Sequence, residues 1–495
     1  MKKILSILFV LIILVGCQNK NNPVLPLPVY TISFEASPLD GGSVSSTASE
    51  VNKGEEITIT ATPISAGWRF VRWEGDISNT TNPLTLQVNN DLFVIAIFER
   101  NNFALNVIIE GSGVVEEAVI ETVPNSFPYQ TEVKLTAIAN EFWTFYEWAG
   151  DISSTEPEII VNLTDEINII ARFSPVHLAE NGITIMCPNV PIGLIGKVDG
   201  VEYEVVDRDL LNQRRNEFQD LSRLCVSNVT DMSGLFRNRQ FNQLINNWDV
   251  SNVTNMNEMF RGSTFNQFIG DWDVSNVTDM SGLFKNTPFN QRVNTWDVSN
   301  VTSMVQMFMN SLFNQPIDRW NVSSVTNMSE MFHGSRFNQH IGDWDVSNVT
   351  NMNQMFRDTD FNQPVENWNV SAVTEMFGMF SDSKFNLPIE NWDVSNVTTM
   401  RWMFNNSEFN LPIGNWNVSK VTNMSWMFRG SIFNQDIGSW NVKNVDNMAY
   451  MFSNASFNRS ISQWCVPNIP SEPDNFATNS ALSSENKPLW GTCPE

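Results

Sequence analysis

Residues 248–269 read W-D-V-S-N-V-T-N-M-N-E-M-F-R-G-S-T-F-N-Q-F-I, and variants of this string fill the chain on both sides of it. Leu224 occupies the tryptophan slot one period earlier, so ten windows fill residues 224–464. A fixed period of about 20 to 50 residues is typical of a solenoid, because one short unit cannot bury its apolar side alone but a stack of units can. The tryptophan recurs every 24 residues without slippage, at Trp248, Trp272, Trp296, Trp320, Trp344, Trp368, Trp392, Trp416, Trp440 and Trp464.

Eight columns of the window, counted from the tryptophan, are nearly invariant and apolar. After the tryptophan come Val at columns two and five, Met at eight, Met or Leu at eleven, Phe at twelve and seventeen, and Ile or Val at twenty-one. We expect these side chains to line a common interior, where burying each large one is worth about 1.5–3 kcal/mol. The M-x-x-M-F segment predicts a short helical turn, and F-N-x-x-I predicts a short strand.

Asparagine follows the second phenylalanine in all ten windows. Its amide can bond backbone groups of its own coil and of the neighbouring coil, where buried polar groups must be paired. We interpret this column as a structural ladder, formed by Asn242, Asn266, Asn290, Asn314, Asn338, Asn362, Asn386, Asn410, Asn434 and Asn458.

Column one, directly after the tryptophan, holds Asp in some windows and Asn in others, as in Asp345 and Asn369. A calcium ladder would need the charge to be retained from window to window. The exchange of carboxylate for amide therefore favours a hydrogen-bonding role over a metal site.

The unit W-D-V-S-N-V-T-N-M-x-x-M-F-x-x-S-x-F-N-Q-x-I resembles the 24-residue repeat of BspA-like bacterial surface proteins, also known from mycoplasma lipoproteins. It is similar to the leucine-rich repeats of spirochaete and oral-bacterial adhesins. The resemblance covers about half of the chain and implies a right-handed, leucine-rich-repeat-like solenoid of about ten coils with a narrow parallel sheet. The expected fold class is mainly β with short helical turns, with two small β modules before the solenoid.

These two β modules span residues 30–99 and 102–174. The string W-E-G-D-I-S at 73–78 returns 75 residues later as W-A-G-D-I-S at 148–153. Alternating β-branched and polar residues around both strings predict antiparallel strands with one buried face. The shared pattern resembles the divergent B-repeat modules of internalin-type surface proteins, which implies a spacer role. We interpret Asp76 as holding its own turn rather than a metal.

The first residues predict export. Two lysines and an apolar run of 12 residues, too short to span a bilayer, are typical of a signal peptide over residues 1–16. The string L-V-G-C ending at Cys17 resembles the bacterial lipobox, which implies cleavage before Cys17, its lipidation, and a lipidated tether over residues 17–29. An ordinary signal peptide with a coincidental cysteine is the alternative. We expect lipid anchoring to a bacterial membrane, at the outer membrane or cell surface.

Four further cysteines mark the ends of the solenoid. Cys225 and Cys465 would lie ten coils apart, beyond the Cα separation of about 7 Å that a disulfide permits. We therefore predict the pairs Cys187–Cys225 and Cys465–Cys493, with four free thiols as the alternative. The first pair belongs to an N-terminal cap over residues 175–223, in which residues 205–211 begin a helix, and the second to a C-terminal cap over residues 465–495.

No catalytic pattern is present. The chain has three histidines and no H-E-x-x-H, nucleophile elbow, Gly-rich phosphate loop or zinc-spaced cysteine pair. We expect no enzyme activity, no cofactor and no metal. The net charge of −25 disfavours nucleic acid as a partner, because phosphate binding needs clustered Lys and Arg.

Column ten varies and suggests where recognition lies. Gly, Glu and Gln fill it in earlier windows, and Trp402, Trp426 and Tyr450 fill it in three consecutive later ones, with Arg401 beside Trp402. These four residues are the candidate ligand-binding set, which could stack on sugar rings or anchor a protein partner. Alternatively, the C-terminal cap folds back and covers them.

We therefore expect a non-catalytic, lipid-anchored cell-surface protein. Its solenoid would bind a protein ligand through the variable face, and the resemblance implies adhesion. A carbohydrate-binding component of a glycan-uptake system and a structural envelope spacer are the alternatives.

Overall fold

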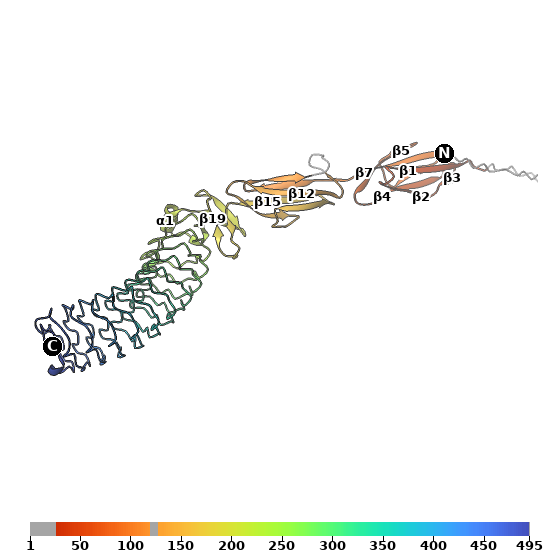
Figure 1. Cartoon of the computed structure of the whole chain (residues 1–495). Helices are drawn as coiled ribbons and strands as arrows, with labels where there is room; N and C mark the ends of the chain where they lie inside the picture. Colours follow the sequence, from red (N-terminus) through yellow and green to blue (C-terminus); the bar gives the residue numbers. More distant parts are fainter. Residues whose placement is uncertain (1–25, 119–126, 495) are drawn as a thin grey trace, which may run out of the picture. The chain divides into compact units, whose positions relative to one another are not determined.

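The computed structural model describes residues 26–118 and 127–494 (Figure 1). The predicted signal peptide and Cys17, the predicted lipidation site, lie outside the described residues. The fold is mainly β. Within the described ranges, no helix combines the length and apolar character needed to cross a bilayer. The chain divides into two compact units, one comprising Met1–Ile109, Val115–Ile138 and Glu147–Ala171, the other Glu110–Val114, Ala139–Tyr146 and Arg172–Glu495.

The first β module has two sheets, ordered β3-β1-β7-β5 and β2-β4-β6. Trp73 is fully buried between them, and its indole N–H donates to the Thr81 carbonyl at 2.9 Å. The prediction that all strands pair antiparallel is wrong for β1 and β7, which are parallel. They are the first and last strands of the module, so no hairpin joins them and an antiparallel pairing is not imposed. The strands are β1 (Val29–Ser37), β2 (Gly42–Ser46), β3 (Glu50–Asn52), β4 (Glu56–Pro63), β5 (Trp68–Gly75), β6 (Leu84–Gln87) and β7 (Leu92–Arg100).

Asp76 at the end of β5 bonds a different strand rather than its own turn. Its carboxylate accepts the Phe93 N–H at 2.7 Å, and its own N–H donates to the Phe93 carbonyl at 2.9 Å. Asp151 and Asn168 form the same pair of bonds in the second module. The interpretation of Asp76 as a self-contained turn is therefore wrong, since the carboxylate fastens β5 to β7 seventeen residues away.

The second module repeats this plan with sheets ordered β10-β12-β14 and β13-β15-β9 and a β11-β8 pair. Trp148 is again fully buried, and its indole N–H donates to the Glu156 carbonyl at 3.0 Å. Its strands are β8 (Asn102–Phe103), β9 (Leu105–Glu110), β10 (Gly113–Ala118), β11 (Phe127–Pro128), β12 (Thr131–Ala139), β13 (Thr144–Gly150), β14 (Glu158–Leu163) and β15 (Ile167–Ser174).

A cap of short strands and one helix precedes the repeats. The predicted cap helix is present but begins at Arg208, because Val205 still belongs to β19. The Asp207 carboxylate accepts the Leu210 N–H at 2.9 Å and starts α1. Arg214 and Arg215 in its last turn complement the helix dipole. The elements are β16 (His177–Leu178), β17 (Ile185–Met186), β18 (Ile195–Val198), β19 (Val201–Val205), α1 (Arg208–Asn216), η1 (Leu221–Arg223) and β20 (Leu224–Cys225).

Both predicted disulfides are present, Cys187–Cys225 and Cys465–Cys493. The first joins the cap to the first window, where both of its residues are fully buried. The second lies in the last winding of the chain.

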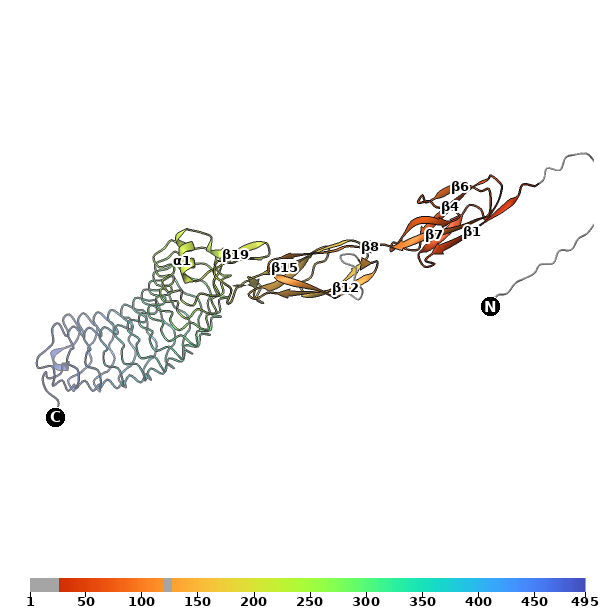
Figure 2. The same ribbon diagram turned by 90° about the horizontal axis from the view of Figure 1, so that it is seen from above.

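We call residues 224–494 the repeat stack. Each window lies beside the next, as Figures 1 and 2 both show, and backbone bonds join them. The N–H of Phe260, for example, donates to the Leu283 carbonyl at 3.1 Å. One parallel bridge links each window to its neighbour at column seven, in the series Asp231, Asn255, Asp279, Ser303, Asn327, Asn351, Glu375, Thr399, Asn423 and Asn447.

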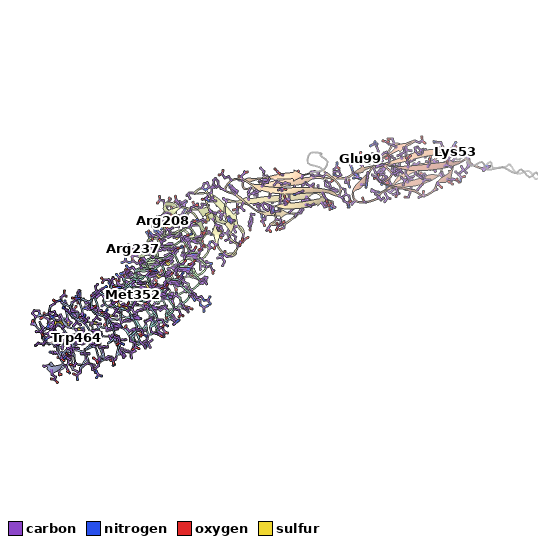
Figure 3. All side chains as sticks on the ribbon, in the orientation of Figure 1. Lys53, Glu99, Arg208, Arg237, Met352 and Trp464 are labelled. Carbon is purple, nitrogen blue, oxygen red and sulfur yellow. A yellow bond between two sulfur atoms is a disulfide. The ribbon has the colours of Figure 1, made fainter. Side chains whose placement is uncertain are left out.

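The eight apolar columns fill the interior of the stack. Met352 and Trp464, labelled in Figure 3, are fully buried. Equivalent rings lie nearly parallel in successive windows, with centroids 6.4 Å apart for Trp296 and Trp320. Every core tryptophan from Trp248 to Trp464 donates its indole N–H to a carbonyl 27 residues earlier, at 2.9–3.1 Å. The polar end of each indole is thereby satisfied inside an apolar core.

The predicted helical turn in M-x-x-M-F is wrong, and so is the predicted strand in F-N-x-x-I. A helix needs every N–H to bond four residues back. Here the Met259 N–H donates to the Met256 carbonyl, three residues back, at 3.1 Å. The next N–H, of Phe260, donates instead to the Leu283 carbonyl in the following window. This alternation arises because the backbone is left-handed at columns ten and fourteen, with φ of 52° at Glu258 and 66° at Gly262.

The C-terminal cap continues the winding. The Tyr450 N–H donates to the Asp474 carbonyl at 3.0 Å, and the Phe452 N–H donates to the Phe476 carbonyl at 2.8 Å. The ring of Phe476 stands perpendicular to that of Phe452, which ends the parallel ring stack. A short helix η2 (Ser484–Asn486) and the second disulfide complete this cap.

Candidate ligand-binding surface

The column-ten surface consists of the residues at column ten with their neighbours at columns nine and thirteen. Its non-glycine column-ten side chains are half-buried. All ten column-ten residues have φ between 52° and 65°, which favours glycine: Gly234, Glu258, Gly282, Gln306, Glu330, Gln354, Gly378, Trp402, Trp426 and Tyr450. The three glycines in this column are the sequence signal for this left-handed backbone.

The N-terminal part of this surface is a charged network. Glu258 pairs with Arg237, labelled in Figure 3, at 2.7 Å and also contacts Arg261. The Lys285 ammonium donates to Gln306 at 2.7 Å. Burial lowers the pKa of Lys285, and the charge of Arg261 lowers it further. The Gln306 amide donates in turn to Glu330 at 3.1 Å, one window further along.

The C-terminal part is aromatic. The ring of Trp426 stacks on that of Tyr450, with centroids 4.3 Å apart and planes 21° apart. Trp402 is tilted by 41° against Trp426, at 5.6 Å. Phe377 at column nine joins the row, 6.0 Å from Trp402. The structure thus brings the three predicted aromatic residues together and adds Phe377, which sequence reasoning missed because it lies one column away.

Arginines lie against these rings. The guanidinium carbon of Arg401 is 5.6 Å from the ring centroids of both Phe377 and Trp402, and that of Arg429 is 4.7 Å from the centroid of Trp426. These distances are those of cation–π contacts. Among the described residues, no carboxylate lies within 4.0 Å of either guanidinium.

A third arginine reaches the aromatic part across a glycine. Gly378 leaves column ten without a side chain between Gln354 and Trp402, and an added Cβ would lie 3.2 Å from the Gln354 side chain. The guanidinium carbon of Arg357 lies 5.4 Å from the Trp402 centroid. Asp382 is 3.9 Å from this arginine, so Arg357 is partly neutralised.

Trp402 contrasts with the core tryptophans. Its indole nitrogen is buried and has no hydrogen-bond partner within the part of the chain that the structure describes. Leaving a buried donor unpaired costs about 1–3 kcal/mol. Its φ of 64° adds about 1–2 kcal/mol relative to glycine, which other windows carry at this column. The fold therefore does not require tryptophan here.

The C-terminal cap does not fold back over the column-ten surface. Because the cap continues the winding, the residue that follows Tyr450 in column ten is Asn475, which has φ of 49° and is exposed. The three aromatic residues are half-buried, but they are covered by one another and by the arginines rather than by the C-terminal cap. Arg401 itself is exposed.

The asparagine column forms a continuous chain of bonds. Each side-chain oxygen accepts the backbone N–H of the asparagine in the next window, as from Asn338 to Asn314 at 3.0 Å. The remaining links join Asn242, Asn266, Asn290, Asn314, Asn338, Asn362, Asn386, Asn410, Asn434 and Asn458 at 2.8–3.0 Å. The column thus holds neighbouring windows in register.

Column one makes the same bond with either residue type. Asp345 accepts the Ser347 N–H at 3.0 Å, and Asn369 accepts the Ser371 N–H at 3.2 Å. Within residues 26–118 and 127–494, no cluster of His, Cys, Asp or Glu has the grouping of a metal site. The exchange of Asp and Asn at column one is thereby explained by an acceptor that both side chains carry.

Acid is expected to weaken the repeat stack through column one. Hydrogen bonds from the following serines lower the pKa of Asp297, Asp345 and Asp393. A carboxylate whose folded pKa lies below its unfolded value of about 3.9 stabilises above that pH and loses this contribution as the pH falls through the folded pKa. The triple variant D297N/D345N/D393N should therefore lose less stability than the wild type between about pH 5 and pH 2 in urea denaturation. An identical pH dependence of the two proteins would contradict this assignment.

Two family models match the chain. One, described as Mycoplasma protein of unknown function, DUF285, matches residues 208–312, 286–386, 309–408 and 381–489, which together cover more than half of the chain. The other, described as Divergent InlB B-repeat domain, matches residues 30–102 and 107–177. Neither description names an enzyme. The curated proteins and the solved structures gave no significant match.

Proposed function

The chain belongs to the family described as Mycoplasma protein of unknown function, DUF285, and on that premise we propose that it is a non-catalytic, lipid-anchored adhesion protein of the cell surface. In this proposal the repeat stack is a right-handed, leucine-rich-repeat-like solenoid of ten coils. The parallel bridges at each 24-residue step and the shared apolar interior support that architecture. The two B-repeat modules act as spacers between the anchor and the solenoid.

The observation that carries a binding role is the contrast between Trp402 and the core tryptophans. Each core tryptophan donates its indole N–H to a carbonyl. The indole N–H of Trp402 has no such partner among the described residues, and the backbone of Trp402 is left-handed. Strained positions of this kind concentrate at functional sites. Large aromatic side chains and arginines are also the residues that dominate binding energy at interfaces. The aromatic part of the column-ten surface is therefore the contact region for a ligand.

A carbohydrate-binding role in a glycan-uptake system is the second candidate. Aromatic side chains gathered with polar groups that can fix a ligand's orientation favour it. A structural spacer remains the function if no ligand binds.

Binding by the full chain tests these functions. We expect W402A/W426A to lose the wild-type protein's binding to host-cell proteins in pull-down or to a glycan array by at least about tenfold. The matched control is E258A/Q306A, which truncates column ten in the charged part, away from Trp402, and should leave binding unchanged. Loss of a protein partner supports adhesion, and loss of a glycan supports the second candidate. A wild-type protein that binds nothing, or a double variant that binds everything the wild type binds, would overturn the proposal.

A further inference from the structure

We infer that the aromatic part of the column-ten surface binds an acidic polysaccharide, one bearing carboxylate or sulfate groups. This inference rests on the proposed binding function and deepens its second candidate, in which the ligand is a glycan. The binding surface comprises Trp402, Trp426 and Tyr450 with Arg401 and Arg429.

Ring orientation argues against stacking a neutral sugar on these aromatic faces. The faces of Trp426 and Tyr450 pack on each other at 4.3 Å, and Arg429 covers Trp426. Tyr450 and Arg429 thus lie over the ring of Trp426, and Trp426 covers one face of Tyr450, so little free aromatic face is left for a neutral sugar. Aromatic edges carry the positive side of the ring quadrupole. Edges and guanidinium groups together favour negative charge.

The charge balance of the chain makes arginines without a carboxylate partner unexpected. The protein carries 54 acidic and 29 basic residues, so acidic partners are abundant. Arg401 and Arg429 nevertheless have no carboxylate within 4.0 Å among the described residues. A guanidinium with free donors can form charge-assisted, often bidentate bonds to carboxylate or sulfate oxygens.

An acidic residue lies at each end of this surface. Asp382 lies 3.9 Å from Arg357 toward the N-terminal side, and the exposed Asp474 follows Tyr450 in the cap. The unneutralised cations thus lie between two carboxylates, centred on Arg401 and Arg429. Arg401 and Arg429 belong to adjacent windows, so a polymer that presents anionic groups repeatedly can meet both of them.

The test measures binding of size-matched oligosaccharides to the full chain by calorimetry. The probes are an oligogalacturonate, a heparin oligosaccharide and a neutral cello-oligosaccharide, with an oligoglutamate of equal charge as a fourth. We expect the two acidic sugars to bind, with affinity falling as salt rises, and the neutral sugar to bind at least about tenfold more weakly. Carboxylate and sulfate sources are distinguished by which acidic sugar binds more tightly.

Variants locate the site. R401Q/R429Q should lower affinity for the acidic sugars by about tenfold or more, because each removed guanidinium loses charge-assisted bonds. R292Q/R336Q removes two exposed arginines at other columns and should change affinity little. Unchanged near-UV circular dichroism establishes that both variants are folded.

Several outcomes would overturn the inference. Oligoglutamate binding as tightly as the sugars, or equal losses in both arginine pairs, would reduce the effect to general attraction of polyanions. Binding of a neutral glycan or a protein that depends on Trp402 and Trp426 but not on the arginines would refute the acidic ligand and leave the proposed function standing. Absence of every ligand would remove both.

Discussion

Replacing Phe332 with alanine is expected to lower the free energy of unfolding of the repeat stack by about 3–5 kcal/mol. The ring is fully buried and lies 5.8 Å from those of Phe308 and Phe356 and 4.0 Å from that of Phe337. Backbone bonds to both neighbouring windows fix the spacing of these rings, so the cavity cannot close by collapse. Urea denaturation followed by near-UV circular dichroism measures the loss.

The matched control for this change is Arg336→Ala, four residues away on the exposed side of the same window. Surface substitutions of this kind usually change stability by less than about 0.5 kcal/mol. Hydrogen exchange adds a spatial readout, since windows contact mainly their neighbours and protection should fall first beside the cavity. A Phe332 variant as stable as the Arg336 variant would show that the rings are not one continuous core.

Removing the N-terminal disulfide with C187S/C225S is expected to cost about 4 kcal/mol, from the chain entropy of the loop that it closes. The bridged residues are 38 positions apart and both are fully buried. The bond fastens the cap strands over the first window, whose apolar interior would otherwise face water. Thermal or urea unfolding of the oxidised variant and wild type measures the difference.

The C-terminal pair supplies the comparison for this experiment. C465S/C493S opens a span of 28 residues, so the same model predicts a loss only a few tenths of a kcal/mol smaller. Hydrogen exchange should localise each loss to its own end of the stack. A loss below about 1 kcal/mol for the N-terminal pair would show that the cap holds to the first window without its covalent bond.

The period of 24 was sufficient to predict the buried columns and both disulfides, because these follow from counting along the chain. It was not sufficient to predict the backbone conformation within a window. Met and Phe at columns eight, eleven and twelve have helical spacing, yet consecutive turns give the same spacing. The decisive signal was at column fourteen, where Asn238, Gly262 and Asp358 represent the only three residue types present.

Long-range partners were also beyond the reach of sequence patterns. Asp76 sits in a Gly-Asp turn, but its bond goes to Phe93, which only the folded sheet brings near. In the candidate site, the aromatic row was visible as a column, whereas Phe377 and Arg357 belong to other columns. Their contact with Trp402 depends on the gap at Gly378, which no local rule reports.

The bonds of the core tryptophans bear on how such a chain can change in length. Trp320 donates one 24-residue step back along the stack, to the Val293 carbonyl three residues before Trp296, and every other core indole makes the same 27-residue bond. Because all partners are defined by fixed offsets, excising one whole 24-residue unit brings an equivalent carbonyl under each indole. Excising one residue more or fewer changes the offset of each indole bond that spans the cut and so removes its carbonyl partner. Unequal recombination between repeats can therefore lengthen or shorten the gene product in whole units, while small insertions within a unit are selected against.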